Sequence, residues 1–522
     1  MRKFNVTGVC VPSKHYMVDI SNKLKQITTL IDEGSYFTLN RARQYGKTTT
    51  LASLTHILEH SYTVILLSFE GLGTESFVNA KVFCHMFMEL VGEALEFTDV
   101  SEEYRESWLD YEVIDFKKLS RHLTKMCKNQ KLVLMIDEVD KVSNNQVFLN
   151  FLSVLRSKYL ASQKERDFTF QSVILAGVYD IKNIKLKLIN AGIHAPVQTE
   201  GTVYNSPWNI AINFKVDMSF SPDEISTMLN DYEIDHDIGM NIKTIAEEIY
   251  RYTSGYPFLV SRVCQCLAEE LGNNWTPKGI QEAMQIILIE KNTLFDDLAK
   301  NLENNLSLRE LLYDVLILGQ RRTFSFDVPT IDLASMYGYI KNERQRIGIA
   351  NKIFEIRICN YFIAKDEKMS YSKIKGVFYH DVIVDDHFNM EYCLKKFAEH
   401  YHEIFNEKDD SFLERHGRII FLSFLKPLLN GYGFYHIESQ TTNERRMDLV
   451  VDFGCDQFII ELKLWYGEAA QEKAYDQLLG YMNAKNNDKG YLLTFDFRKD
   501  TNKEFKAEWI QIEDKQIFEV IV

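Results

Sequence analysis

The first 280 residues of the chain alternate short, uninterrupted apolar runs with longer amphipathic segments. The apolar runs are the length of single β-strands, and the clearest are Tyr36–Leu39, Thr63–Leu67, Leu132–Ile136 and Phe170–Leu175. Because their hydrophobicity is continuous, they fit strands that are buried on both faces. The alternation therefore predicts an α/β fold built around a parallel sheet.

A Gly-Lys-Thr sequence follows the first of these runs and opens a segment with helical character. The loop reads N-R-A-R-Q-Y-G-K-T over residues 40–48. Gly46 would let the backbone approach a phosphate, Lys47 would reach the β- and γ-phosphates, and Thr48 would hold Mg²⁺. Arg41 stands where the first glycine of a standard phosphate-binding loop belongs, so this loop needs support from a second motif.

That second motif is the pair of acids at the end of the third apolar run, about 90 residues downstream. Asp137 would bind Mg²⁺ through its water shell, and Glu138 would polarise the water that attacks the γ-phosphate. Either motif alone also fits an ordinary solvated loop, but the two in this order predict a site for ATP and Mg²⁺. We also assign Arg43, Thr49 and Pro257 to this site, although Pro257 equally fits a plain helix start.

Charged residues interrupt two apolar runs near the C-terminus. Asp448 lies in R-M-D-L-V-V, and Glu461 and Lys463 lie in F-I-I-E-L-K-L. Burying these charges is costly unless they bind a metal or form a tight ion pair. Two carboxylates from neighbouring strands can hold Mg²⁺ against a phosphodiester, and a lysine can steady the attacking water or the developing charge. The pattern predicts a nuclease site.

The spacing of these residues supports one shared site. Glu461 follows Asp448 by thirteen residues, which fits adjacent antiparallel strands joined by a short turn. Glu461 and Lys463 are two residues apart and therefore face the same side of one strand. Gln477 and Tyr481 are four apart on the following helix, where they could brace the site or contact a phosphate. The alternative is a degenerate fold that serves only as a partner surface.

The length of the chain allows two to four domains. We expect four segments: residues 1–280 as an ATPase domain with a lid, 281–375 as a helical or winged-helix-like domain, 376–410 as a helical linker, and 411–522 as a nuclease-like domain. In the last segment we expect a helix, three strands in a meander, a second helix and a final strand that closes the sheet.

Composition limits the partners of the chain. A net charge of −14 argues against nucleic-acid binding over the whole surface, so contacts would use local basic patches such as 321–322, 341–346 and 445–446. The eight cysteines are scattered, which argues against a four-ligand zinc site. The N-terminus lacks the apolar core of a signal peptide, and no run reaches the length of a membrane span. We therefore expect a cytoplasmic protein without a membrane partner.

With these motifs in hand, the first 280 residues resemble the AAA-like P-loop ATPases of bacteria. The resemblance is to the subfamily with an R-x-R-x-x-G-K-[ST] loop and an apolar strand that ends in D-E-[VA]-D, here residues 137–140. It implies an ATP-binding core, a helical lid and a capacity for self-assembly into a homo-oligomer. Arginine at position 41 is usual in that group.

Residues 411–500 resemble the PD-(D/E)XK nuclease superfamily. Asp448 matches its metal-binding aspartate, Glu461 and Lys463 match its E-x-K, and Gln477 to Tyr481 match the Q-x-x-x-Y of its RecB-like branch. No proline precedes Asp448, a departure that is frequent in the superfamily. The resemblance implies cleavage of nucleic acid, with DNA as the expected substrate and Mg²⁺, or Mn²⁺ in its place, as the metal.

The leading hypothesis is therefore an ATP-regulated, Mg²⁺-dependent nuclease, with a role in defence against phage or mobile elements suggested by similar architectures. A second hypothesis is a non-catalytic, ATP-dependent switch whose C-terminal domain only binds nucleic acid or a protein. A third is a DNA-binding regulator that acts through the basic residues between Arg321 and Arg346.

Overall fold

The computed structural model describes residues 2–110, 112–142, 145–178, 208–317, 320, 322–366, 382–384, 387–404, 414–429, 433–439, 447–454, 456–465, 467–485, 487–496 and 506–522. For some of these, including residues 447 and 448, only the backbone is described. The chain divides into two compact units. The first holds residues 1–250, 254–265 and 335–338, and the second holds residues 251–253, 266–334 and 339–522.

The first unit is built on a four-stranded parallel sheet in the order β1-β4-β3-β2. Its strands are β1 (Phe37–Asn40), β2 (Thr63–Ser68), β3 (Leu132–Asp137) and β4 (Ser172–Gly177). Every residue of β3 and β4 is buried, which explains why their sequences are apolar without alternation. The predicted parallel α/β sheet is confirmed, with strand ends shifted by one or two residues.

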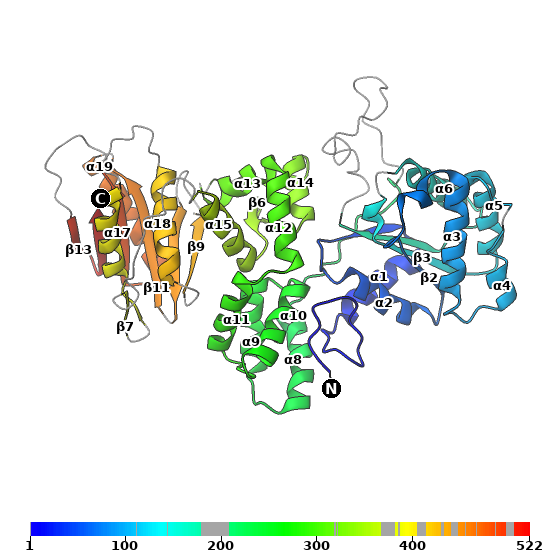
Figure 1. Ribbon diagram of the computed structural model, residues 1–522, viewed down its shortest axis with the longest axis horizontal. Helices are drawn as coiled ribbons and strands as arrows, with labels where there is room; N and C mark the ends of the chain where they lie inside the picture. The colour runs from blue at the N-terminus through cyan, green and yellow to red at the C-terminus, as the bar shows by residue number, and fades with distance from the viewer. Residues whose placement is uncertain are drawn as a thin grey trace, which may run out of the picture. The chain divides into compact units, whose positions relative to one another are not determined.

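Helices cover both faces of this sheet (Figure 1). One face packs against α1 (Ser21–Asp32) and α2 (Lys47–Leu58), where Ile27 and Leu54 are fully buried. The other packs against α3 (Ala80–Leu95), α5 (Phe116–Cys127) and α6 (Gln146–Ser162), through an aromatic core that includes Phe87 and Phe151. The short helix α4 (Glu102–Glu106) lies between α3 and α5 in the sequence.

Three further helices follow the sheet, namely α8 (Pro222–His236), α9 (Ile242–Thr253) and α10 (Pro257–Gln265). The start of α8 is fixed by its sequence, because Ser221 and Glu224 form a reciprocal capping box around Pro222. A π-helical turn, Cys266–Glu270, follows α10.

The second unit begins with a helical region and a β-hairpin. The helices are α11 (Pro277–Ile289), α12 (Thr293–Asn304), α13 (Leu306–Leu316), α14 (Pro329–Met336) and α15 (Lys352–Asp366). The hairpin joins β5 (Ile340–Glu343) to β6 (Arg346–Ile349). Its two turn residues, Arg344 and Gln345, both have positive φ angles, as a tight two-residue hairpin requires. The predicted domain boundaries at 280, 375 and 410 stay predictions.

A six-stranded mixed sheet forms the C-terminal part of the second unit, in the order β13-β14-β12-β11-β10-β9. Its strands are β9 (Gly433–Ser439), β10 (Met447–Phe453), β11 (Asp456–Leu464), β12 (Lys489–Phe495), β13 (Lys506–Ile512) and β14 (Lys515–Ile521). The strands β9, β10 and β11 form the expected antiparallel meander. However, β12 does not close the sheet, because it pairs with β11 on one side and β14 on the other.

Helices also cover both faces of this second sheet (Figure 1). One face carries α19 (Glu468–Lys485), whose Leu478 packs with Ile459, Leu492 and Ile517 of three different strands. The other carries α17 (Met390–Ile404) and α18 (Glu414–Leu429), where Phe397 contacts the ring of Phe495. Two very short strands, β7 (Ile383–Val384) and β8 (His387–Phe388), precede α17.

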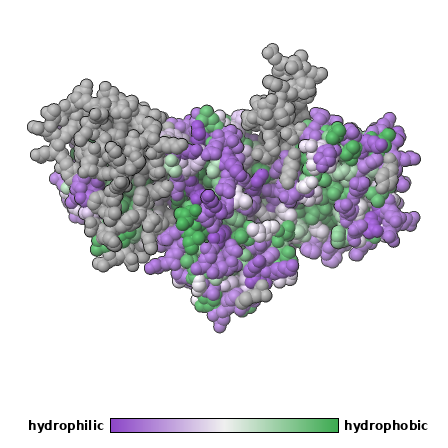
Figure 2. Space-filling view, viewed as in Figure 1, coloured by the Kyte–Doolittle hydropathy of each residue, from purple (hydrophilic) through white to green (hydrophobic). Residues whose placement is uncertain are grey.

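The face drawn in Figure 2 is mainly hydrophilic where it is described, with apolar residues scattered among polar ones. In the described part of the chain, no helix combines the length and the apolar character needed to cross a membrane.

Candidate functional site

The phosphate-binding loop lies between β1 and α2. Gly46 caps the N-terminus of α2 with a φ of 74°, a left-handed conformation that other residues adopt only with strain. A Cβ atom there would meet nothing within 4 Å, so the glycine is needed for its backbone angle and not for space. The N–H groups at the start of α2 therefore form a site of the kind that binds phosphate.

The ammonium of Lys47 rests on the loop itself. It donates hydrogen bonds to the carbonyl oxygens of Arg41 and Ala42, both at 3.0 Å, and the residue is only 7% exposed. Burial lowers the pKa of Lys47, and the carboxylates of Asp140, Glu138 and, less strongly, Asp137 oppose that shift. A lysine held in this way is positioned to transfer its hydrogen bonds to a bound phosphate.

The two predicted halves of the nucleotide site contact each other directly. The hydroxyl of Thr48 donates a hydrogen bond of 2.6 Å to Oδ2 of Asp137 at the end of β3. The other carboxylate oxygen, Oδ1, accepts the N–H of Glu138 at 2.9 Å. Glu138 itself has a φ of 58°, a conformation that costs a residue other than glycine energy and that is often found at functional sites. A hydroxyl and a carboxylate in contact form an oxygen donor set that suits Mg²⁺.

Arg41, at the position of the first glycine of a standard loop, is bonded to a distant part of the chain. Its guanidinium donates to the carbonyl oxygen of Val216 at 2.6 Å and to that of Asn40 at 2.8 Å. It also lies 5.4 Å from the centre of the Phe214 ring, and burial lowers its pKa. The Arg41 side chain therefore joins the phosphate loop to the segment that precedes α8.

The remaining residues predicted to bind nucleotide, Arg43, Thr49 and Pro257, lie in the loop or near it. Arg43 is exposed, and its carbonyl oxygen accepts a hydrogen bond from the hydroxyl of Tyr256, next to Pro257 at the start of α10. The Thr49 hydroxyl accepts the backbone N–H of Cys10 at 3.2 Å. Thr49 and Pro257 thus both lie where α2 and α10 approach the N-terminal segment.

In the C-terminal sheet, β11 carries two of the predicted nuclease residues on one face. Glu461 is 1% exposed and Lys463 is 2% exposed. The Lys463 ammonium forms an ion pair with Oε1 of Glu461 and donates a hydrogen bond of 2.8 Å to Oε1 of Gln477 on α19. The structure therefore brings three predicted residues together, from one strand and the helix that covers it.

Asp448 lies on β10, the neighbouring strand, but its side chain is outside the described part of the structure. Leu449 pairs with Ile460 in the antiparallel register, so backbone position 448 is next to position 461. Tyr481 is half-buried and packs on the apolar cluster beneath α19. Among the residues whose side chains are described, no group of three or more His, Cys, Asp or Glu residues is arranged to hold a metal ion.

Comparison with known protein families gives a match to each of these two regions. The family model of the AAA-like domain matches residues 6–358, more than half of the chain. The chain belongs to the AAA-like domain family. The model of the PD-(D/E)XK nuclease superfamily matches residues 434–507, which include the Asp448, Glu461 and Lys463 positions. The predicted resemblances to AAA-like ATPases and to the PD-(D/E)XK superfamily are confirmed at the level of the family.

Comparison with solved structures gives distant similarities. The Walker-type ATPase PABY2304 of Pyrococcus abyssi is 12% identical, with a TM-score of 0.46, and the match covers 68% of this chain and 99% of that one. The ORC2 protein of Aeropyrum pernix, in its ADPNP–ADP complexes, is 11% identical, with a TM-score of 0.35 over 69% of this chain and 97% of that one. A comparison with curated proteins gave no match.

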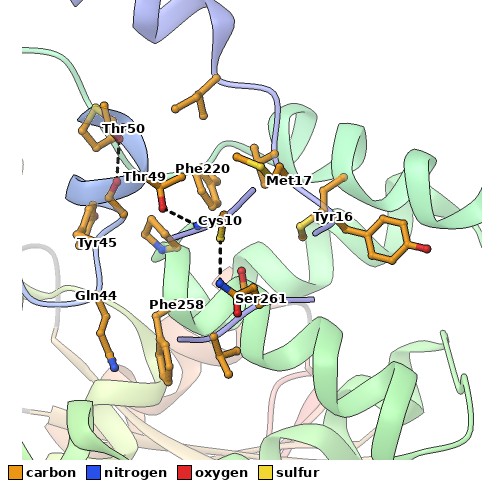
Figure 3. Close-up of a pocket in the computed structure, with 18 of the residues that line it drawn as sticks. Cys10, Tyr16, Met17, Gln44, Tyr45, Thr49, Thr50, Phe220, Phe258 and Ser261 are labelled. Atoms are coloured by element: carbon orange, nitrogen blue, oxygen red, sulfur yellow. Dashed lines mark hydrogen bonds between the residues drawn. The ribbon is translucent and has the colours of Figure 1, made fainter. Parts of the chain in front are cut away.

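A cavity beside the phosphate loop of the AAA-like region was not predicted from the sequence. It has a volume of about 320 Å³ and lies wholly within the first unit. It is lined by the N-terminal segment, by the phosphate loop with α2, and by the helices α8 and α10 with the residues just before α8 (Figure 3). Met17, Phe220 and Phe258 give it an apolar wall. The N-terminal segment carries no recognisable motif, so the sequence did not indicate that it lines a cavity.

The role of Asp140 was also not assigned from the sequence, although the D-E-V-D pattern contains it. Both oxygens of its carboxylate accept the backbone N–H of Val178, at 2.8 and 2.7 Å. A Cβ atom on the preceding Gly177 would collide with this carboxylate. The carbonyl of Gly177 in turn accepts the N–H of Arg41 at 3.1 Å. Asp140 therefore connects the end of β3 to the end of β4. The end of β4 is in turn bonded to the phosphate loop through Gly177 and Arg41.

Proposed function

We propose that this protein is an ATP-binding, Mg²⁺-dependent nuclease in which the AAA-like region regulates cleavage or assembly. The observation that carries the nuclease half is the contact of Lys463 with both Glu461 and Gln477 in a buried part of the sheet. The membership of the chain in the AAA-like family supports the ATP-binding half.

In the nucleotide site, different residues of this chain would bind the phosphates, hold the metal and orient the water. The N–H groups that follow Gly46 and the ammonium of Lys47 would bind the phosphates, while Thr48 and Asp137 would hold Mg²⁺. Mg²⁺ neutralises charge on the phosphates when it is bound. Glu138, next along the chain, would orient the attacking water. The apolar cavity beside the loop is of a size and character that suits the base.

In the nuclease site, Glu461 with Asp448 would hold the divalent metal, which when bound polarises a phosphate and activates water. Lys463 would donate a hydrogen bond to the phosphate oxygen on which negative charge develops. Its ion pair with Glu461 offsets part of the cost of burying the ammonium, and its hydrogen bond to Gln477 fixes its direction. The carboxylate oxygens that this requires are hard donors and fit Mg²⁺ or Mn²⁺.

DNA is the substrate that we propose. Exposed basic residues gather on the β5–β6 hairpin, where Lys341, Arg344 and Arg346 occupy exposed positions and could contact phosphates. The chain as a whole carries a net charge of −14, so such contacts would be local. A homo-oligomer formed through the AAA-like region and a role in defence against phage stay predictions.

A cleavage assay with Mg²⁺, with and without ATP, tests both sites and their coupling. It compares the wild type with Lys463→Ala and Lys47→Ala. We expect Lys463→Ala to abolish cleavage under both conditions, and Lys47→Ala to remove only the response to ATP.

Two buried lysines that lie outside the sites serve as controls. Lys515→Ala changes a lysine of the same sheet that pairs with Asp488, and Lys158→Ala changes one in the first unit that pairs with Asp167. Both should retain cleavage and its ATP response. Cleavage by Lys463→Ala at the wild-type rate would refute the nuclease site, and an unchanged ATP response in Lys47→Ala would refute the regulatory role.

A further inference from the structure

A second buried carboxylate lies on the same sheet as the proposed nuclease site. Glu519 is on β14 and is only 1% exposed. Its Oε1 accepts hydrogen bonds from the Gln471 amide and, at 2.7 Å, from the Tyr475 hydroxyl, and its Oε2 accepts the Lys506 ammonium at 3.1 Å. A charge buried this deeply is tolerated only when it is fully paired, and here both oxygens are satisfied.

Glu519 and Glu461 share one row and one face of the sheet. Glu461 on β11 is in register with Leu492 on β12, and Leu492 is in register with Glu519 on β14. The residues next to them on this face, Ile459 and Ile517, pack with the apolar side of α19. The helix therefore lies over both carboxylates.

Two sets of polar contacts attach α19 to this face. Gln471 and Tyr475 attach it to Glu519, and Gln477 attaches it to Lys463. Gln471 also donates to Thr494, which is in register with Lys463. Six residues of helix separate Gln471 from Gln477, a rise of about 9 Å. Because the helix is stiff over that length, the first attachment fixes the height and rotation at which Gln477 meets Lys463.

We propose that Glu519 is a positioning residue of the nuclease site, which sets the placement of the Lys463 ammonium through α19 and Gln477. The inference rests on the proposed function for its catalytic consequence. It goes beyond that function because Glu519 lies outside the motif residues, and the hydrogen bonds described for it are to Gln471, Tyr475 and Lys506.

The kinetic test is a double-mutant cycle in the full chain. Glu519→Gln should lower kcat for DNA cleavage by about tenfold with little change in KM, because placement of the ammonium is disturbed while binding is retained. In a Gln477→Ala background, Glu519→Gln should lower kcat no further. Additive losses would overturn the proposal, since they would show that Glu519 does not act through Gln477.

A matched control separates positioning from stability. Phe518 precedes Glu519 on β14 but lies on the opposite face, where its ring contacts Tyr491 and Trp509. Phe518→Leu should lower the melting temperature of the sheet and leave kcat within about twofold of the wild type at a temperature where both are folded. An equal loss of kcat in Phe518→Leu and Glu519→Gln would overturn the proposal.

A second measurement does not depend on turnover. Acylation of lysines by acetic anhydride, followed by mass spectrometry, reports how well the Lys463 ammonium is held. Glu519→Gln should raise the labelling rate of Lys463 at least about fivefold relative to the buried Lys158 of the first unit, and Phe518→Leu should not. An unchanged labelling rate of Lys463 in Glu519→Gln would overturn the inference.

The labelling result also separates the inference from the proposed function. If the wild type cleaved no DNA, the proposed function would fail, but the labelling would still decide whether Glu519 positions Lys463.

Discussion

The hydroxyl of Thr48 donates a 2.6 Å hydrogen bond to the carboxylate of Asp137, which is 89 residues away in the sequence. The bond joins the start of α2 to the end of β3, because the carboxyl ends of parallel strands meet at one edge of the sheet. Two oxygen atoms of the kind that Mg²⁺ prefers are thus adjacent beside the phosphate loop. The proposed site for Mg²⁺ and ATP rests on this contact.

Replacing the Thr48 hydroxyl should weaken binding of Mg²⁺–ATP. Thr48→Val keeps the shape of the side chain but removes the oxygen, so we expect an affinity loss of at least about tenfold, or 1.4 kcal/mol. Calorimetric titration with a slowly hydrolysed ATP analogue measures it. Thr55→Val in the same helix is the control, since the Thr55 hydroxyl donates to the backbone carbonyl of Leu51 one turn earlier. Equal affinities in the two variants would show that Thr48 holds no metal.

Arg41 should be needed for stability more than for nucleotide binding. Arg41→Ala removes the bond to Val216 and the contact with Phe214, so the apparent melting temperature should fall by several degrees. The loss of nucleotide affinity should be smaller than in Lys47→Met, because the guanidinium is bonded to the carbonyl oxygens of Asn40 and Val216. Thermal unfolding and nucleotide titration of the two variants measure these effects. A larger loss of nucleotide affinity in Arg41→Ala than in Lys47→Met would contradict a mainly structural role for Arg41.

Asp140 and Gly177 should act as a pair. Asp140→Ala removes the bonds to Val178, and Gly177→Ala pushes a Cβ atom against the same carboxylate. We therefore expect both variants to slow ATP hydrolysis about tenfold while retaining nucleotide binding, because both disturb the contact between β3 and β4. A phosphate-release assay measures the rates. In the double variant the two losses should not add, and additive losses would count against a shared mechanism.

The ion pair of Asp167 with the buried Lys158 should give a defined pH dependence. Burial of Asp167 alone would raise the pKa of its carboxyl, but hydrogen bonds from Lys158 and Thr124 and the charge of Lys158 hold that pKa below 3.8. A folded-state pKa below the unfolded value means that the stabilisation is present above about pH 4 and is lost as the pH falls through the folded value. Wild type should therefore melt at a higher temperature than Asp167→Asn at pH 7, and the difference should shrink below pH 4. If the difference in melting temperature between wild type and Asp167→Asn did not change with pH, the lowered pKa of Asp167 would be contradicted.

The sequence predicted those features that depend on short-range pattern. Continuous apolar runs indicated β3 and β4 because both faces of these strands are buried. The strand-to-helix position of Gly46 indicated the phosphate loop, and the two-residue spacing of Glu461 and Lys463 indicated that they share a face. These rules need only the periodicity of a strand or the special angle of a glycine.

Features that depend on contacts between distant segments were missed. The strands β13 and β14 follow residues 490–495 in the sequence, and no local signal showed that they extend the sheet. Likewise, nothing local to Arg41 indicated that it would bind Val216, 175 residues away. The placement of the Asp448 carboxylate stays a prediction, since only the backbone of that residue is described.

The most direct test of the account is the rate at which the full chain cleaves labelled DNA in Mg²⁺ when Glu461 is changed to Gln. The change keeps the size of the buried side chain but removes the charge that pairs with Lys463 and would hold the metal. The account predicts a loss of at least about a thousandfold relative to wild type, with Phe518→Leu remaining near the wild-type rate. Cleavage by Glu461→Gln at the wild-type rate would contradict the assignment of a nuclease site to this sheet.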